Sequence, residues 1–247
     1  MVTLMSANTL AYIILGAIVF ISLLMVFTSR SRIWRVYSKY LKVQNHAGIT
    51  GEQFAFAARE MLGYDDTQLS LIDGKLSDAY MGGKDKVLFL SEEVAHSASL
   101  ASVTIAAHEF GHAMQDHTND RLYHLTRILQ RITRFTNKLI LPCVLVGVGF
   151  MIFNYEMAIA YGLVFGGVGL FILNALLKIL TIPMERDASG RALKFLKENQ
   201  IISKDEIGKA RKLLSIASQT YMVALFDDFL IVKLWRRLKY GKPRKRR

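Results

Sequence analysis

Two histidines and one glutamate lie within a span of five residues, at a spacing that suits metal chemistry. They form an H-E-x-x-H pattern that runs from His108 to His112. Because residues four apart share one face of an α-helix, the two imidazole rings can bind a single ion. Glu109 lies next to the first histidine, where it can reach a water molecule on that ion and serve as general base. The window 102–114 has no proline and can form such a helix, and its glycine, Gly111, should keep the metal site open.

A catalytic zinc ion is usually held by three protein ligands and a water molecule, so this pattern needs a third ligand. A third histidine in the pattern H-E-x-x-H-x-x-G-x-x-H is absent, because positions 115 and 118 are Gln and Thr. A carboxylate from a second helix is the other solution, and the best candidate is Glu185, close behind Pro183 and a long apolar stretch. An acidic residue there also suits a helix start through capping and the helix dipole, and the two interpretations are compatible.

The competing interpretation of the histidine pattern is a surface helix that carries both side chains by chance, since only three positions are specified. Together with the rest of the chain, the zinc site is the stronger interpretation. The sequence therefore predicts Zn²⁺ as cofactor, with His108, His112 and Glu185 as metal ligands and Glu109 as the catalytic residue.

The composition indicates a membrane protein. The 247 residues are 52% hydrophobic and carry a formal net charge of +12. Such a chain is too apolar for an ordinary soluble domain, and a basic balance indicates nucleic acid or an anionic membrane surface. Its basic residues follow apolar runs, at 30–42 and in the tail 236–247, and no recognisable nucleic-acid-binding module accompanies them. We therefore expect a lipid bilayer as partner and no specific nucleic acid.

Residues 1–29 are expected to form an N-terminal transmembrane anchor. The uncharged segment 10–27, as a helix, is long enough to cross about 27 Å of hydrocarbon. A cleaved signal peptide would need basic residues before this segment, but none precede it and five follow. That asymmetry favours an uncleaved anchor, with the residues from 30 onward in the cytoplasm.

Two further apolar stretches, 139–153 and 157–182, are separated by only three residues. So short a connection predicts an antiparallel transmembrane hairpin, and the near absence of charge argues against a soluble one. Three small residues, four apart, would let its helices approach closely: Ala158, Gly162 and Gly166. Because a hairpin returns the chain to its starting side, Glu185 should re-emerge on the side of the histidines, close to the membrane surface.

The domain organisation follows from these assignments. Residues 30–137 should form the cytoplasmic-facing first part of a metalloprotease domain with the H-E-x-x-H helix, and residues 138–182 the hairpin. Residues 183–247 should contain the third-ligand helix, a C-terminal helix and a basic tail. The sequence does not determine whether residues 214–235 cross the membrane, but two adjacent aspartates favour an interfacial or protein-packed helix with its tail in the cytoplasm. The expected protein is multi-pass in the cell membrane, with its active site facing the cytoplasm.

Small β elements are expected before the H-E-x-x-H helix, in an otherwise predominantly α fold. A capping box at 50–53 predicts a helix that ends at Gly63. The runs 69–72 and 86–90 are strand-like, and 80–83 reads as a turn. The second strand either presents an open edge on which an extended peptide can lie, or is an ordinary half-buried strand.

Several stretches together resemble the YugP-like neutral zinc metallopeptidases of bacterial membranes. They are GKLSDAY at 74–80, VLFLS at 87–91, AAHEFGHA at 106–113, ERDAS at 185–189 and RAL at 191–193. The resemblance covers most of the chain, and the family looks related in plan to gluzincins, including membrane proteases of the HtpX and CAAX-processing type. It implies a gluzincin-like zinc metalloprotease domain combined with transmembrane helices. It also implies His108, His112 and Glu185 as zinc ligands, and Glu109 as general base.

The chain departs from the HtpX pattern at one position near the third ligand. In HtpX-type enzymes an aspartate lies four residues after the ligand glutamate, and here that position is Ser189. Asp187 lies two residues after Glu185, so its role in supporting a ligand stays open.

We therefore expect a membrane-embedded, zinc-dependent endopeptidase that hydrolyses peptide bonds of membrane or membrane-proximal proteins, with a protein or peptide as substrate. Oxyanion stabilisation needs a further donor, for which Tyr80, His117 and His124 are candidates. The alternative is a non-catalytic membrane scaffold or adaptor with a structural zinc site. The sequence does not determine the substrate, the cleavage specificity, the regulators or the oligomeric state.

Overall fold

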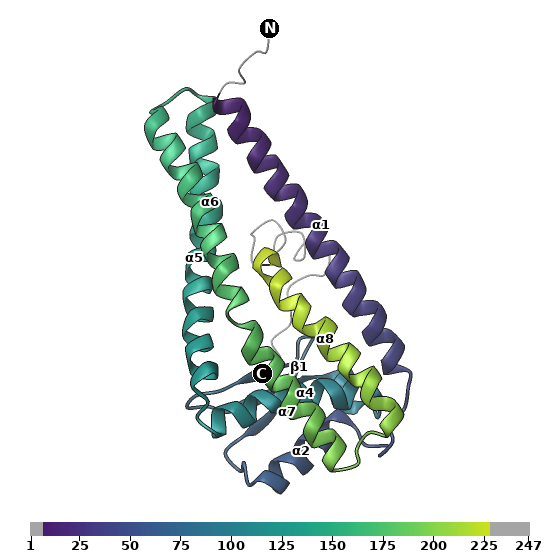
Figure 1. Ribbon diagram of the computed structural model, residues 1–247. Coiled ribbons are helices and arrows are strands. Elements are labelled where there is room, and N and C mark those ends of the chain that lie inside the picture. Colours follow the sequence, from purple (N-terminus) through teal and green to yellow (C-terminus); the bar gives the residue numbers. More distant parts are fainter. Residues whose placement is uncertain (1–6, 228–247) are drawn as a thin grey trace. The chain divides into compact units, whose positions relative to one another are not determined.

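The computed structural model describes residues 7–227, in which helices predominate over one small sheet (Figure 1). This confirms the predicted class, predominantly α with a small β element. The described chain divides into two compact units. Residues 7–31, 129–179 and 221–227 belong to one unit, and residues 32–128 and 180–220 belong to the other, which contains the H-E-x-x-H helix.

Helix α4 (Leu100–His117) is the central helix of the second unit. The hydroxyl of Ser99 caps its start by accepting the Ser102 N–H at 3.1 Å. Many of its side chains are small, so neighbouring elements approach it from several sides and bury most of its length. It confirms the helix predicted around the histidine pattern.

The neighbours of α4 share one apolar core with it. They are α2 (Gly51–Leu62), α3 (Glu92–His96), α7 (Ile182–Glu198) and the first turns of α8 (Lys204–Asp227). Aromatic rings join three of these helices: Phe54 meets Phe110 and Phe195 edge-on, with ring centroids 6.3 and 5.8 Å away. Helix α2 has the predicted reciprocal capping box at its start and ends at Gly63 in the left-handed conformation, with φ of 66°.

The sheet has three strands in the order β1-β3-β2. Strand β1 (Gln68–Ile72) runs parallel to β3 (Val87–Ser91), and β2 (Ala79–Met81) runs antiparallel to it. Strand β3, which precedes the helices that lead to the histidines, is therefore the central strand. The interpretation that β3 presents an open edge is wrong. The prediction of a turn at 80–83 is also wrong in part, because Tyr80 and Met81 belong to β2. The bend after β2 covers residues 83–85.

Helices α5 (Arg121–Ile152) and α6 (Met157–Ile179) form the antiparallel hairpin expected from the short connector. Two stretches of the described chain are long and apolar enough to cross a membrane, Arg121–Ile152 and Met157–Glu198. In the second stretch the apolar part is α6, because α7 carries charged residues from Glu185 onward. Length and composition thus support two candidate spans.

The residues that let α5 and α6 approach closely differ from those predicted. A Cβ at Gly147 would lie 2.9 Å from the carbonyl oxygen of Ala160, and one at Gly167 would lie 2.7 Å from Val144 Cγ2. By contrast, no described atom lies within 4 Å of a Cβ built at Gly162 or Gly166. The predicted stripe of Ala158, Gly162 and Gly166 therefore does not make the helix contact. Because α6 is apolar on all faces, its sequence alone does not mark the packed face.

The predictions for the two ends of the chain fall largely outside the described side chains. Helix α1 (Ala7–Leu41) is continuous past residue 29, and most side chains of the expected anchor at 10–27 are not among those described. Helix α8 is described as far as Asp227, so the end of the segment 214–235 and the basic tail lie outside the described residues. The anchor and the placement of the C-terminal segment stay predictions.

Candidate metal centre

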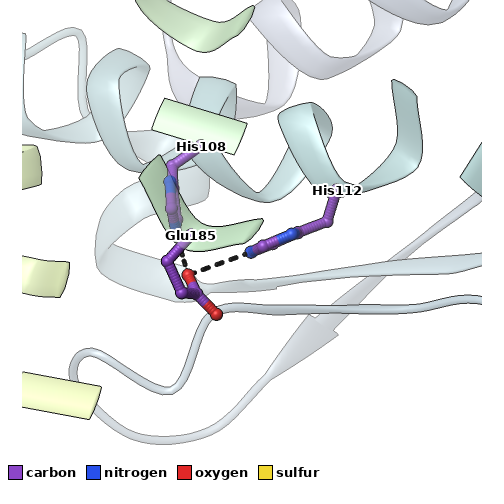
Figure 2. Close-up of side chains that lie close together, drawn as sticks. All are labelled: His108, His112 and Glu185. Atoms are coloured by element: carbon purple, nitrogen blue, oxygen red, sulfur yellow. Dashed lines mark ion pairs between the residues drawn. The ribbon is translucent and has the colours of Figure 1, made fainter. Parts of the chain in front are cut away.

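Helix α4 presents its two histidines on one face, as their four-residue spacing predicts (Figure 2). The ring centroids of His108 and His112 lie 4.9 Å apart, with an interplanar angle of 74°. Their side chains are only 5% and 7% exposed. The two rings are therefore held inside the protein with their Nε2 atoms directed toward a common neighbour.

That neighbour is Glu185, which α7 supplies from 73 residues further along the chain than His112. Its Oε2 atom lies 3.4 Å from Nε2 of each histidine, along the two dashed lines of Figure 2. The ligand atoms of the three residues all lie within 4.8 Å of one another. Ligand atoms of a tetrahedral zinc ion are about 3.3–3.5 Å apart, so the two 3.4 Å separations fit zinc coordination.

The hydrogen bonding of these atoms supports the same conclusion. Nε2 of His108 and Oε2 of Glu185 are buried, and neither makes a hydrogen bond with a protein group in the described part of the chain. Such atoms are rare in folded proteins, because a buried lone pair without a partner is costly. Two imidazole nitrogens and one carboxylate oxygen are also a donor set that catalytic zinc uses. The three side chains thus fit a Zn²⁺ ion.

The charges of the cluster are mutually stabilising. Burial alone would raise the pKa of Glu185, but the two histidines outweigh burial and lower this pKa to about 2. Burial alone would lower the pKa of His112, but its contact with Glu185 raises this pKa to about 9. At neutral pH the Glu185 carboxylate is therefore ionised, and its negative charge faces the two imidazole rings.

Gly111 allows α4 and α7 to come close enough for this cluster to form. A Cβ at Gly111 would lie 2.5 Å from the carbonyl oxygen of Ala188. The glycine thus faces the backbone of α7, one turn after Glu185. Its role is to permit the contact between two helices, and the prediction that it keeps the metal site open is wrong.

We expect Gly111→Ala to lower both the stability of the fold and the affinity for zinc. The added methyl group must displace a backbone oxygen, and overpacking of this kind costs about 1–3 kcal/mol. The higher helix propensity of alanine returns at most about 1 kcal/mol. Denaturant unfolding of the detergent-solubilised protein measures the first effect, and zinc competition against a chromophoric chelator measures the second.

Gly190→Ala is the matched control for this substitution. Gly190 lies on α7, and no described atom is within 4 Å of its added Cβ. This variant should be neutral or more stable by up to about 1 kcal/mol, with unchanged zinc affinity. If Gly111→Ala behaved in the same way, the close approach at Ala188 would not be what positions Glu185.

Comparison with known proteins places the chain in a family. Residues 12–240 match the family model described as "Putative neutral zinc metallopeptidase". The chain belongs to this family. A curated relative, "Putative membrane protease YugP" of Bacillus subtilis (strain 168), is 27% identical over 214 residues, which make up 85% of this chain and 91% of the relative. No solved structure matches the chain. The resemblance inferred from the sequence motifs is therefore confirmed.

In this member of the zinc metallopeptidase family, both histidines have a neutral partner on the ring nitrogen that faces away from Glu185. Nδ1 of His108 lies 3.2 Å from the hydroxyl of Ser189, and Nδ1 of His112 lies 2.9 Å from Oε1 of Gln115. An Nδ1–H that donates to these oxygens leaves Nε2 with its lone pair free for a metal ion. Ser189, four residues after Glu185, thus contacts the first histidine of the pattern.

The candidate general base, Glu109, is also buried, at 6% exposure. Burial is the main cause that raises its pKa, and the neighbouring histidines partly oppose this effect. Its Oε2 atom accepts the backbone N–H of Tyr80 at 3.0 Å. This hydrogen bond holds the carboxylate between the H-E-x-x-H helix and strand β2.

The structure does not bring the predicted oxyanion donors to the cluster through any described contact. The hydroxyl of Tyr80 donates to Asp116 at 3.0 Å. The ring of His117 stacks on Tyr64, and its Nε2 lies 3.1 Å from the Thr67 hydroxyl. His124 packs edge-on against Tyr123, with ring centroids 5.6 Å apart. Each of these side chains is therefore directed to a partner outside the ligand cluster.

Three residues near the site were not assigned a role from the sequence. The ring of Tyr123 packs against that of His112, with centroids 6.3 Å apart and an interplanar angle of 30°. Asp116 accepts the Tyr80 hydroxyl and the Gly83 N–H, and so anchors the turn after β2. Gln115 contacts His112 directly. The sequence signal that could have identified Gln115 and Asp116 is helical spacing. These positions follow His112 by three and four residues and so lie near it on the same helix.

Proposed function

We propose that this protein is a membrane-embedded, zinc-dependent endopeptidase that hydrolyses peptide bonds of membrane or membrane-proximal proteins. The observation that carries the proposal is the buried convergence of His108, His112 and Glu185 beside a second buried carboxylate, Glu109. The family's description as a zinc metallopeptidase and the relative's description as a membrane protease agree with it.

In the proposed mechanism each side chain has a separate task. His108, His112 and Glu185 would hold a zinc ion, whose chemistry in the site would be to supply positive charge for polarising a carbonyl and acidifying water. Glu109 accepts a proton from the attacking water at its carboxylate and passes it to the amine that leaves. The raised pKa of Glu109 suits a carboxylate that must hold that proton between the two steps.

Strand β2 is the proposed binding edge for the substrate. It lies at the edge of the sheet, and its Tyr80 N–H is directed to Glu109 rather than to β3. An extended peptide that lies along this edge would pass the general base and the ligand cluster with its backbone aligned. We therefore propose that the substrate is bound through its main chain, in an extended conformation.

Multi-pass insertion and a cytoplasmic site are part of the same proposal. The clusters of basic residues beside the apolar stretches support this orientation. Labelling of intact cells with a membrane-impermeant thiol reagent tests it in a Cys143→Ser background. The variant Phe153→Cys, in the hairpin connector, should react and Lys204→Cys should not; the reverse pattern would reject the orientation.

Metal removal is the direct test of the proposed function. We expect the detergent-solubilised protein to cleave a fluorogenic casein, to lose this activity in 1,10-phenanthroline and to regain it with stoichiometric zinc. The loss should be nearly complete, because both polarisation of the carbonyl and activation of water depend on the ion. Cleavage that persists in the metal-free protein would contradict a zinc-dependent mechanism.

A further inference from the structure

Gln115 is the most deeply buried polar side chain beside the ligand cluster that the proposed mechanism leaves without a task. It is 1% exposed, at the C-terminal end of α4 and one turn beyond His112. Its side-chain amide makes three described hydrogen bonds, one to His112 within α4 and two to α7. A buried amide with all its partners in place is a rigid link between the elements that it joins.

The two ends of the amide have different tasks. Oε1 lies 2.9 Å from Nδ1 of His112, where it is the acceptor for an Nδ1–H. Nε2 donates to the carbonyl oxygen of Met184 at 2.9 Å and to Oδ2 of Asp187 at 2.8 Å. These two acceptors flank Glu185 on α7. The Gln115 side chain therefore contacts His112 and two groups of α7, one before and one after Glu185 in the sequence.

The Asp187 end of this link is itself held in place. Arg191 donates from Nε to Asp187 at 2.6 Å and from Nη2 to Asp120 at 3.0 Å. Asp120 in turn accepts the N–H of Leu122 at the start of α5. Gln115 thus donates to a carboxylate that the Arg191 guanidinium group already orients, and a hydrogen bond to a charged acceptor is stronger than one between neutral groups.

Only an amide satisfies this environment. The position needs an acceptor toward His112 and two donors toward α7, and a glutamine side chain supplies both. A carboxylate keeps the acceptor but has no donor, and it would face the Met184 carbonyl and Asp187. An apolar side chain of the same length would leave Nδ1 of His112 and the Met184 carbonyl without the amide as a partner, and Asp187 would keep Arg191.

We infer that Gln115 is a positioning residue that locks the ring of His112 to the helix carrying Glu185, so that two of the three ligands are set as one unit. The inference rests on the proposed metal site and adds to it a group that fixes the position of His112 relative to α7. Groups that orient a ligand histidine typically change metal affinity by about 10–100-fold when they are replaced.

Gln115→Glu is the most informative substitution, because it removes only the two donors and adds repulsion toward Asp187. We expect it to weaken zinc binding by about 10–100-fold, measured by competition with a chromophoric chelator. The visible absorption spectrum of the Co²⁺-substituted protein should change as well, since His112 and Glu185 would no longer keep their relative positions.

A second substitution should reverse this effect. In Gln115→Glu/Asp187→Asn the amide is transferred to position 187, where it donates to the carboxylate at 115, and Arg191 still finds an oxygen acceptor. We expect the double variant to recover most of the zinc affinity and the wild-type cobalt spectrum.

Asp187→Asn alone should have a smaller effect than Gln115→Glu, because the Asp187 side chain is 43% exposed and can turn to water. Gln68→Glu, at an exposed position of β1, is the charge-matched control and should bind zinc as the wild type does.

The outcomes separate the inference from the metal site on which it rests. If the wild-type protein bound no zinc, the proposed site would be rejected and the inference with it. If the wild type bound zinc and Gln115→Glu kept its affinity and cobalt spectrum, only the positioning role would be rejected. The positioning role would also be rejected if Gln115→Glu lowered the thermal stability of the metal-free protein but the folded, cobalt-substituted variant kept the wild-type spectrum. Should Gln115→Glu fail to fold, Gln115→Met is measured in the same way, and the same results decide.

Discussion

Replacing Glu109 by glutamine should nearly abolish peptide hydrolysis while zinc remains bound. The amide cannot accept the proton of the attacking water, and proton transfer by a positioned side chain contributes about 10²–10⁴-fold to rate. The fold should tolerate the change, because the amide oxygen can still accept the Tyr80 N–H that the carboxylate accepts at 3.0 Å. Steady-state cleavage of fluorogenic casein and zinc content per protein are the two measurements.

Glu60→Gln is the matched control for this prediction. Glu60 is exposed on α2, so the same chemical change there should leave cleavage and zinc content unchanged. Cleavage by Glu109→Gln at the wild-type rate would remove Glu109 from the mechanism. A loss of cleavage together with a loss of zinc would show instead that Glu109 supports the metal site.

Replacing Glu185 by glutamine should remove most of the bound zinc. The substitution takes away the only carboxylate of the cluster and leaves a neutral amide oxygen, a poor zinc ligand, 3.4 Å from two imidazole nitrogens. Loss of a direct ligand should exceed the approximately 10–100-fold loss of affinity expected when an outer partner is removed. Zinc competition with a chromophoric chelator measures the affinity, and casein cleavage at saturating zinc measures any remaining activity.

Glu198→Gln lies on the same helix and serves as the control, because the Glu198 side chain is 60% exposed at the far end of α7. It should bind zinc normally. Wild-type zinc affinity in Glu185→Gln would mean that another group completes the site, and the proposed ligand set would be rejected.

Much of the local structure was predictable because it depends on short-range interactions. The capping box at Thr50 and the left-handed Gly63 define α2 through hydrogen bonds among neighbouring residues. The strand-like runs become β1 and β3 nearly as predicted. The order of the strands was not predictable, because strand pairing joins segments distant in sequence. This order places β2 at the edge of the sheet, where its Tyr80 N–H meets Glu109.

The hairpin shows the same division between local and distant information. Its existence followed from two apolar stretches and a short connector. The packed faces of α5 and α6 could not be predicted from the sequence. An apolar helix has small residues on several faces, and which face is packed depends on the partner helix. Gly147 and Gly167 make the contact, whereas Gly162 and Gly166 do not.

The sequence by itself determined the H-E-x-x-H helix, since a four-residue spacing brings His108 and His112 to one helical face whatever the rest of the chain does. It also made Glu185 the best acidic candidate. Only the tertiary structure decided that this carboxylate reaches the rings, because the meeting depends on how closely α7 approaches α4 at Gly111 and Ala188. The link through Gln115 was decided there too, since its donors need acceptors from α7 that no spacing along α4 reveals.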